Sequence, residues 1–390
     1  MKIETVDDFS DYIAKVEKKS GYVRPTAFAL GVRRSRKDTT LDVTYPVINF
    51  QESYGTAAII ADALGVSGDS NQFIEIEKDT LEKIYNQFLP FHPEAEKHYN
   101  VQSIKRMLRA SESRYDGYSK MTIGVFFMYD GSKGVESAEE AYFKLQLLSQ
   151  RKVKPHGVCL DGAFGKLANI AWTNYGPILP QDIEQERMRH LYKEIPLLVT
   201  HVDKFPYMIN YHIPTGVRVA AGSQVRLGAY LGEGTTVMPA GYVNFNAGTE
   251  GNAMIEGRVS AGVVVAKDSD IGGGASIMGT LSGGNNNVIS IGEKCLMGAM
   301  SGTGISLGFG CTIAAGCYVT AGSKISLYDA GNNPVDIDGN KVEEGKNIVK
   351  GAQLNGKDKL LFMQDSQSGK LICKPNPKTI ELNAALHHND

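Results

Sequence analysis

The sequence predicts an α/β domain that is followed by a parallel β-helix and a small β-rich C-terminal segment. Three observations predict this. A six-residue period of apolar side chains runs from Val225 to Ile325, the same stretch is rich in glycine, and the first two hundred residues alternate between helix and strand patterns. A period of six fits neither an α-helix nor an ordinary strand, so it indicates a coiled backbone with a corner every six residues.

The apolar period is stronger than chance. Twelve of the seventeen in-phase positions are Ile, Leu or Val, although only 22 of the 101 residues in the stretch are of these types. Chance would place about four of them in phase. A four-residue shift follows Ala261. The positions predicted to point inward are Val225, Leu231, Val237, Val243, Thr249, Ile255 and Ala261, then Ile271, Ile277, Gly283, Ile289, Cys295, Ser301, Leu307, Ile313, Val319 and Ile325.

Glycine marks the corners of the coil. Between Gly216 and Gly322 lie 24 of the chain's 43 glycines, a density that suits tight corners with positive φ. Short strands, three to a turn, would stack each inward side chain on the one eighteen residues earlier. The glycine-rich run at 272–276 could be mistaken for a phosphate loop, but it lacks the Gly-Lys-Ser/Thr ending of such a loop. We expect it to be a corner of the coil. Residues 281–288 are expected to form an external loop.

The flanking regions carry ordinary helix and strand signals. We expect a strand at 121–129, ended by Asp130-Gly131, and hairpins at 336–344 and 359–374 that cap the open end of the coil. Helices are expected at 56–65, 78–88, 101–111 and 137–150. The predicted domains are an α/β domain at 1–205, a catalytic β-helix at 206–327 and a C-terminal hairpin cap at 328–390.

Composition argues against several classes of protein. The net charge is −2 and Lys and Arg form no long run, which argues against nucleic-acid or membrane partners. The acidic start lacks a signal-peptide pattern and no run of eighteen apolar residues occurs, so we expect a cytoplasmic protein. Five cysteines without C-x-x-C spacing are expected to be reduced, with Cys295, Cys311 and Cys317 as small core residues.

One acidic residue stands out in the repeat. Only Glu293 and Lys294 are Asp, Glu, Lys or Arg among residues 271–322, so the upstream run at 255–258 is unusual. If Ile255 points inward, Glu256 points outward, and Gly257 is expected to keep the backbone open to a ligand. We predict Glu256 as the catalytic acid or base. The alternative is a solvated glutamate beside Arg258.

Metal chemistry is not expected in the coil. No histidine lies between His212 and His387, so the coil cannot supply a cluster of imidazole ligands. His201 and His212 are expected to be structural.

Five runs carry a resemblance to a known family. They are residues 200–206, 225–231, 243–249, 255–262 and 274–284. Together they closely resemble the tetrahydrodipicolinate N-succinyltransferases, in the longer branch of that family, over about residues 195–365. The resemblance to hexapeptide-repeat proteins also implies a left-handed coil, a handedness that the period alone does not give.

The resemblance implies a reaction. Family members transfer the succinyl group of succinyl-CoA to the amine of open-chain tetrahydrodipicolinate in the diaminopimelate and lysine pathway, and they release CoA. They are homotrimers whose active sites lie between subunits. No permanently bound cofactor is implied. An acetyl-CoA-dependent N-acetyltransferase and a non-catalytic β-helix scaffold remain as alternatives.

The resemblance also implies roles for individual residues. Glu256 matches the catalytic glutamate, which is described either as forming an acyl anhydride or as a base, and we favour the base. Arg258 would bind the carboxylate of the acyl donor, while Arg226 and Arg218 are weaker candidates for the acceptor. Further acyl-CoA contacts implied by the match are Gly273, Ser276, Ala299, Ala315, Gly322, Lys350, Met363 and Ser366. No axial magnesium is expected, because residues 221–223 and 239–241 lack the carboxylates that some related proteins carry.

Overall fold

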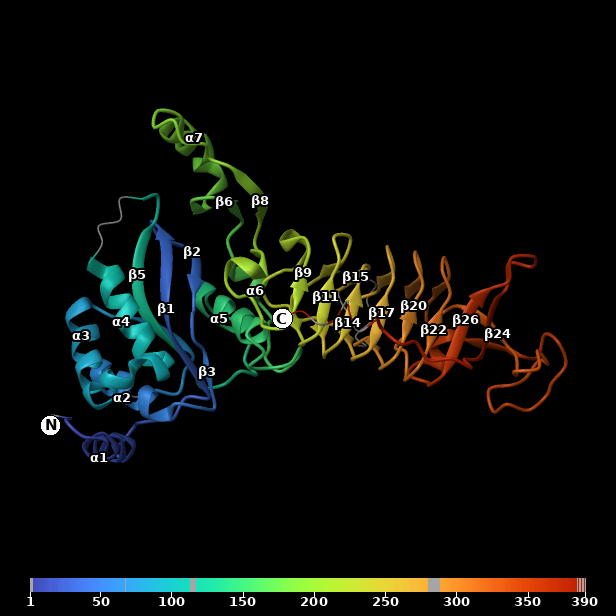
Figure 1. The fold of residues 1–390 in the computed structure, drawn as a ribbon, viewed down its shortest axis with the longest axis horizontal. Helices are drawn as coiled ribbons and strands as arrows, with labels where there is room; N and C mark the ends of the chain where they lie inside the picture. The colour runs from blue at the N-terminus through green and yellow to red at the C-terminus, as the bar shows by residue number, and fades with distance from the viewer. Residues whose placement is uncertain are drawn as a thin grey trace. The chain divides into compact units, whose positions relative to one another are not determined.

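The computed structural model describes residues 3–66, 68–112, 117–279, 288–383, 385, 387 and 389. The chain forms two compact units, one of Met1–Leu147 with Gly157–Pro206 and the other of Leu148–His156 with Tyr207–Asp390. Figure 1 shows their elements. The described helices are all too short or too polar to cross a membrane. Of the external loop expected at 281–288, all but Val288 lies outside the described residues.

The first unit is built on an antiparallel sheet with the strand order β2-β1-β5-β4. The strand expected at 121–129 is confirmed as β5. It lies beside β1, and its last residues are completely buried because both faces of the sheet are covered. The strands are β1 (Ala27–Arg36), β2 (Thr39–Thr44), β3 (Asn49–Phe50), β4 (Gln72–Glu75) and β5 (Lys120–Met128).

Helices cover both faces of this sheet. Val125 and Phe127 belong to the core cluster beneath α2, α3 and α4. Phe126 points to the other face, where its ring centroid lies 4.7 Å from that of Phe143 on α5. The four predicted helices are confirmed, whereas α1, α6 (Ala163–Lys166) and α7 (Ile183–Leu191) were not predicted. The first five helices are α1 (Val6–Glu17), α2 (Tyr54–Leu64), α3 (Lys78–Gln87), α4 (Tyr99–Glu112) and α5 (Ala138–Ser149).

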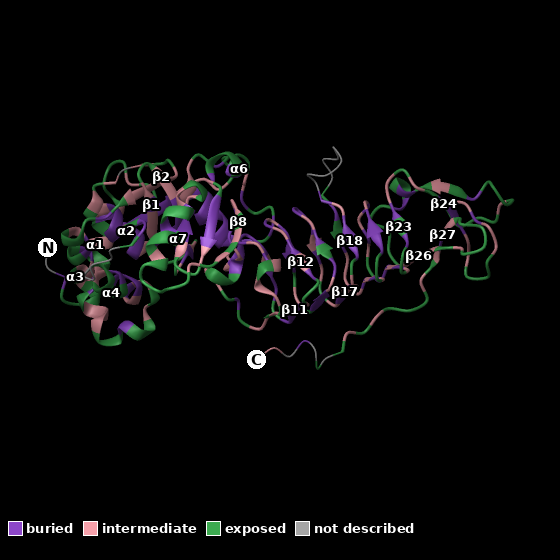
Figure 2. Cartoon of the chain, turned by 90° about the horizontal axis from the view of Figure 1, so that it is seen from above, coloured by how far each residue is buried: buried purple, intermediate pink, exposed green. Residues whose placement is uncertain are grey.

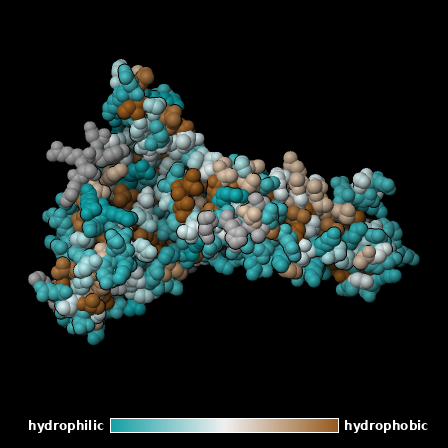
Figure 3. All heavy atoms as spheres, in the orientation of Figure 1, coloured by the Kyte–Doolittle hydropathy of each residue, from teal (hydrophilic) through white to brown (hydrophobic). Residues whose placement is uncertain are grey.

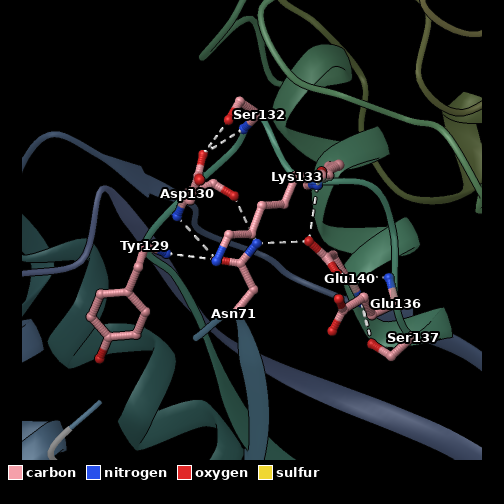
Figure 4. A network of polar contacts seen from close by, with 9 residues as sticks. Asn71, Tyr129, Asp130, Ser132, Lys133, Glu136, Ser137 and Glu140 are labelled. Carbon is pink, nitrogen blue, oxygen red and sulfur yellow. Dashed lines mark hydrogen bonds and ion pairs between the residues drawn. The ribbon is translucent and has the colours of Figure 1, made fainter. Parts of the chain in front are cut away.

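A buried polar network fixes the start of α5 (Figure 4). Lys144 and Glu140 are almost completely buried and form an ion pair of 2.9 Å. The Asn71 amide donates to Glu140 Oε1 and to the carbonyl of Asp130, both at 2.8 Å. The Ser137 hydroxyl accepts the amide N–H of Glu140, which caps the helix. The network satisfies both buried charges, so it holds the loop before α5 against the helix.

A second small sheet carries an exposed apolar surface. It is formed by β6 (Ile170–Thr173), β7 (Gly176–Ile178) and β8 (Val199–Asp203), with α7 (Ile183–Leu191) in the same segment. We call residues 170–203 the arm. Figure 3 shows hydrophobic atoms in brown at its surface. The large apolar side chains exposed there include Met188, Leu191, Tyr192, Ile195 and Leu198.

The second unit contains a left-handed parallel β-helix, as predicted (Figure 1). Each turn places one short strand on each of three faces. Face 1 is formed by β9 (Arg218–Val219), β11 (Thr235–Val237), β14 (Ala253–Ile255), β17 (Ser269–Ile271), β20 (Leu296–Met297) and β22 (Thr312–Ile313). Face 2 is formed by β12 (Tyr242–Val243), β15 (Arg258–Val259), β18 (Ser276–Ile277), β21 (Gly302–Thr303) and β23 (Tyr318–Val319). Face 3 is formed by β10 (Tyr230–Leu231), β13 (Gly248–Thr249), β16 (Val264–Val265) and β19 (Ser290–Ile291).

The corner columns between these faces are named here edge 1–2, edge 2–3 and edge 3–1. The predicted corner at 272–276 is confirmed, because Gly274 joins β17 to β18 on edge 1–2 with a φ of 70°. Such a conformation favours glycine.

The predicted period holds, but part of its phase was wrong. Ile255 pairs with Ile271 and Met297 pairs with Ile313, so these two turns contain sixteen residues and not eighteen. As a result Val259 and not Ala261 joins the inward column. After the undescribed segment the paired residues are Ile291, Met297 and Thr303 in place of the predicted Ile289, Cys295 and Ser301.

The error has a physical reason. Ile289, Cys295 and Ser301 are buried as well, because the residue two positions before each stacked side chain also faces the interior near a corner. Two inward positions in each repeat make the phase ambiguous wherever a turn is shortened. Figure 2 shows the buried strands in purple along the whole coil.

The C-terminal segment closes the last turn. The hairpin expected at 359–374 is confirmed as β26 (Leu360–Gln364) and β27 (Leu371–Pro375), and β26 continues face 1 by pairing with β22. The hairpin expected at 336–344 is not a strand pair, since only the bridge between Val335 and Lys341 forms there. Asp336 Oδ1 accepts the N–H groups of Asp338 and Asn340, and this turn replaces strand pairing.

The buried ion pair of α5 yields a stability prediction. Glu140→Ala leaves Lys144 buried without its carboxylate, so we expect a loss of about 3–5 kcal/mol in the free energy of unfolding. Urea unfolding followed by circular dichroism at 222 nm measures it, because the described α-helices lie almost wholly in the first unit.

The matched control is Glu82→Ala. Glu82 and Lys78 have the same i, i+4 spacing, but both are solvent-exposed and 3.8 Å apart. We expect a change below about 1 kcal/mol. Equal losses in the two variants would contradict a special role for the buried pair.

Candidate active site

Glu256 lies on edge 1–2, directly after β14. Ile255 is fully buried and pairs with Ile271, so the next side chain points out of the coil, as predicted. The amide N–H of Glu256 donates to the Ile271 carbonyl at 2.8 Å. Its carboxylate lies over Gly273 on the following turn, since a Cβ on that glycine would be 3.6 Å from Oε2. The half-buried carboxylate therefore projects from a rigid edge.

Small residues continue this edge below Glu256. Gly273, Ala299 and Ala315 occupy equivalent corner positions on successive turns. Their corners are joined by hydrogen bonds, from Met300 N to the Gly273 carbonyl and from Gly316 N to the Ala299 carbonyl, both 2.9 Å. The result is a column of backbone and small side chains, except at Met300, whose exposed side chain lies beside Gly274.

Met363 follows Phe362 at the end of the same column, where β26 extends face 1. Four strand spacings separate β14 from β26 on this face. At 4.7–4.9 Å per spacing, the column is about 19 Å long.

Face 2 places two further predicted residues beside the edge. Arg258 and Ser276 are register partners on β15 and β18. The guanidinium Nη2 donates to the Ser276 hydroxyl at 2.5 Å. The side chain of Arg258 is exposed and thus accessible to an anion. Arg258 thus binds Ser276 on the next turn. This contact argues against the alternative that Glu256 and Arg258 are merely a solvated pair of charges.

The other predicted residues lie elsewhere on the coil. Gly322 is on edge 2–3, and the segment of Lys350 pairs with Lys324 of β24 (Lys324–Leu327) and packs below that corner. Arg226 is also on edge 2–3, near the first turn, where Nη1 donates to Asn244 Oδ1 at 3.3 Å. Arg218 is exposed on face 1, and Ser366 is exposed after β26. A single chain therefore does not bring these residues together with Glu256.

Gly257 has a different role from the one expected. It is buried, and a Cβ there would lie 2.4 Å from the Ala275 carbonyl oxygen and 2.8 Å from a methyl of Ile271. The glycine therefore permits close packing of successive turns. It does not open the backbone to a ligand.

Sequence reasoning missed Asp270. This residue points outward from β17, the strand that pairs with β14 on the turn of Glu256. Burial raises the pKa of Asp270, the Glu256 carboxylate raises it further, and His387 opposes the rise. Asp270 directly precedes the charge-poor stretch 271–322, so the low charge of that stretch did not reveal it.

The described residues contain no metal-binding cluster, and the cysteines of the coil are buried. Among them, no group of three or more His, Cys, Asp or Glu side chains is arranged to hold a metal ion. Cys295, Cys311 and Cys317 are buried core residues, as predicted. Burial raises the pKa of Cys317 to about 11, so this thiol is a poor nucleophile.

A left-handed β-helix whose edge combines one carboxylate with a column of small residues defines the class of hexapeptide-repeat acyltransferases. Family models agree with this class. Residues 7–165 match the tetrahydrodipicolinate N-succinyltransferase N-terminal model, residues 167–207 match the middle model of the same enzymes, and residues 288–321 match the hexapeptide repeat of succinyl-transferase. The chain belongs to the tetrahydrodipicolinate N-succinyltransferase family.

Individual relatives support this assignment. The chain is 44% identical to the 2,3,4,5-tetrahydropyridine-2,6-dicarboxylate N-succinyltransferase of Pseudomonas paraeruginosa, over 93% of this chain and 98% of that protein. The enzyme of the same name from Vibrio cholerae is 54% identical over 65% of this chain and 71% of that protein. A crystal structure described as a 2,3,4,5-tetrahydropyridine-2-carboxylate N-succinyltransferase from Campylobacter jejuni superposes on this chain with a TM-score of 0.85. The two sequences are 37% identical, and the superposition covers 97% of this chain and 100% of that chain.

Proposed function

We propose that this protein transfers the succinyl group of succinyl-CoA to the amine of open-chain tetrahydrodipicolinate, L-2-amino-6-oxopimelate, and releases CoA. The reaction belongs to diaminopimelate and lysine biosynthesis. The observation that carries the proposal is the carboxylate of Glu256 at the head of a column of small residues about 19 Å long. Succinyl-CoA and free cysteines both fit a cytoplasmic location.

Glu256 acts as a general base in this proposal. The amine attacks the thioester carbonyl, and the nitrogen becomes acidic as the new C–N bond forms. Glu256 accepts the proton, the tetrahedral intermediate expels the CoA thiolate, and the proton then passes to that sulfur or to solvent. A base avoids the high-energy anhydride of the alternative mechanism.

The small column holds the pantetheine arm. Gly273, Ala299 and Ala315 leave backbone groups accessible, and an extended thioester arm needs hydrogen bonds without bulky side chains. Arg258 binds the succinyl carboxylate next to Glu256, because a planar guanidinium matches a carboxylate in a bidentate way. Met363, Ser366 and Lys350 lie toward the nucleotide end of CoA. Arg218 and Arg226 serve the dicarboxylate acceptor.

The active enzyme is a homotrimer with its sites between subunits. A corner of a prism is convex, so edge 1–2 contacts a bound arm from one side only, and a second chain supplies the other wall. Gly322 and Lys350, near edge 2–3, then belong to the wall that a neighbour provides. The exposed apolar side chains of the arm are a further reason to expect association.

The central prediction concerns Glu256→Gln. The amide keeps the size of the side chain but cannot accept the proton, so we expect kcat to fall by about 10²–10⁴-fold with little change in CoA affinity. A continuous assay of CoA release and calorimetric titration with CoA measure the two quantities. Glu250→Gln is the control, since Glu250 only forms a surface ion pair with Lys154. A Glu256→Gln enzyme with unchanged kcat removes this residue from the mechanism.

Arg258→Lys tests donor recognition. Lysine keeps the charge but loses the bidentate fork, so we expect KM for succinyl-CoA to rise at least tenfold. The rate with acetyl-CoA should not change, because that donor has no carboxylate. Initial rates with both thioesters also separate the succinyltransferase from the acetyltransferase alternative. Equal effects on the two donors would assign Arg258 to another role.

Mixed trimers test the shared site. Glu256→Gln disables edge 1–2, and Gly322→Phe obstructs edge 2–3, where a Cβ meets open space in the single chain. If each site takes one edge from each of two neighbours, refolding the two inactive variants together restores some sites with two intact edges. The restored rate is compared with that of each variant refolded alone. No recovery in trimers of verified mixed composition would place the whole site within one chain.

A further inference from the structure

One column of outward-facing side chains runs along face 2, beside edge 1–2. The first residues of the five strands of this face pair in parallel register, and they are Tyr242, Arg258, Ser276, Gly302 and Tyr318. The residue after each of them is buried in the coil, so the column itself points outward. Figure 2 shows β12, β18 and β23 of this face in order along the coil. From the second position on, the column places a cation, a hydroxyl group, a glycine and a phenol on successive turns.

The ring of Tyr318 lies over Gly302, its register partner on the preceding turn. A Cβ on Gly302 would be 2.1 Å from Cε1, 2.4 Å from Cδ1 and 2.9 Å from Cζ of this ring. Any side chain at position 302 would therefore displace the ring. Because Cζ lies close to Gly302, the hydroxyl-bearing end of the ring reaches the level of that turn. The phenol is thus one turn nearer to Ser276 than the backbone of Tyr318 is.

The phenol group of Tyr318 is available to a ligand. The residue is 51% exposed, and its hydroxyl group forms no hydrogen bond with another described residue. A phenol can donate one hydrogen bond and also accept one. Since the ring packs over the backbone of Gly302, the donor is held in place before a ligand arrives.

Arg258 reaches along the same face from the opposite direction. Its Nη2 donates to the Ser276 hydroxyl, so the guanidinium extends toward the next turn, and its other N–H groups remain available as donors. Two strand spacings, about 10 Å, separate the backbones of Ser276 and Tyr318. No large side chain stands between the guanidinium and the phenol, because serine is short and Gly302 has no side chain. A carboxylate between them can accept hydrogen bonds from both.

We propose that Tyr318 determines specificity for the acyl donor, because its O–H donates to the terminal carboxylate of the succinyl group while Arg258 binds the same carboxylate from the other side. The inference rests on the proposed function. An arginine alone attracts any anion, whereas a second donor on the same face fixes where the carboxylate lies. A donor with an apolar end leaves both groups without their partner, so the site discriminates against it.

Calorimetric titration of the full chain without acceptor tests the inference with succinyl-CoA and butyryl-CoA. The two acyl groups have the same number of carbons, but butyryl-CoA has no carboxylate. We expect the unmodified protein to bind succinyl-CoA at least about tenfold more tightly. Tyr318→Phe keeps the ring over Gly302 and removes only the O–H. We expect it to weaken succinyl-CoA binding about tenfold and to leave butyryl-CoA binding unchanged.

Gly302→Ala tests the placement of the ring. The added methyl group displaces the ring without removing the phenol, and the strand backbone of β21 accepts alanine. We expect this variant also to lose affinity for succinyl-CoA. In the double variant with Tyr318→Phe the two losses should not add, because a displaced ring without its O–H has no donor left to misplace. Full additivity would overturn the inference.

The matched control is Tyr175→Phe. Tyr175 is 45% exposed and belongs to the first unit, so its affinity for both thioesters should equal that of the unmodified protein. Unchanged succinyl-CoA binding in Tyr318→Phe, or an equal loss for butyryl-CoA, would overturn this inference and leave the proposed function standing. Absence of thioester binding to the unmodified protein would overturn both.

Discussion

The parallel pairing of successive turns is the constraint on which the second unit depends. Each turn must place an inward side chain above the one before it, because the hydrogen bonds of all three faces fix the register. That register decides which residues reach an edge. Glu256 projects outward because Ile255 is held inside, and the small residues below it line up because every turn repeats the same corner.

The period of the sequence was sufficient to predict the coil and the outward direction of Glu256. It was not sufficient to follow the phase, since Cys295 and Met297 are both buried and only the pairing of strands shows which one stacks. Local spacing also misassigned Gly257, whose importance lies in a contact with the next turn that no sequence pattern displays. The proximity of Asp270 to Glu256 follows from the pairing of β17 with β14, which the sequence does not show.

The separation of residues over two edges explains why one chain is an incomplete catalyst in the proposed mechanism. Edge 1–2 carries Glu256, the proposed base, and the segment near edge 2–3 carries Gly322 and Lys350. The family resemblance grouped all of these residues as one site. In a rigid prism they cannot approach one another, so a rotation that brings two copies together is the simplest arrangement that unites them.

The C-terminal tail, described at residues 376–383, 385, 387 and 389, contacts both ends of edge 3–1 and changes how the coil is expected to unfold. Stacked repeats usually fray from an end, because each contacts only its neighbours. Here Asn376 contacts Gly310 near the last turns and His387 contacts Gly234 near the first. His387 and Gly234 are 153 residues apart in the sequence, and their contact lies at the opposite end of edge 3–1 from the contact of Asn376. For a terminal turn to unfold, the contacts of the tail along this edge must first break. The turns of the coil are therefore expected to unfold together and not one after another from an end.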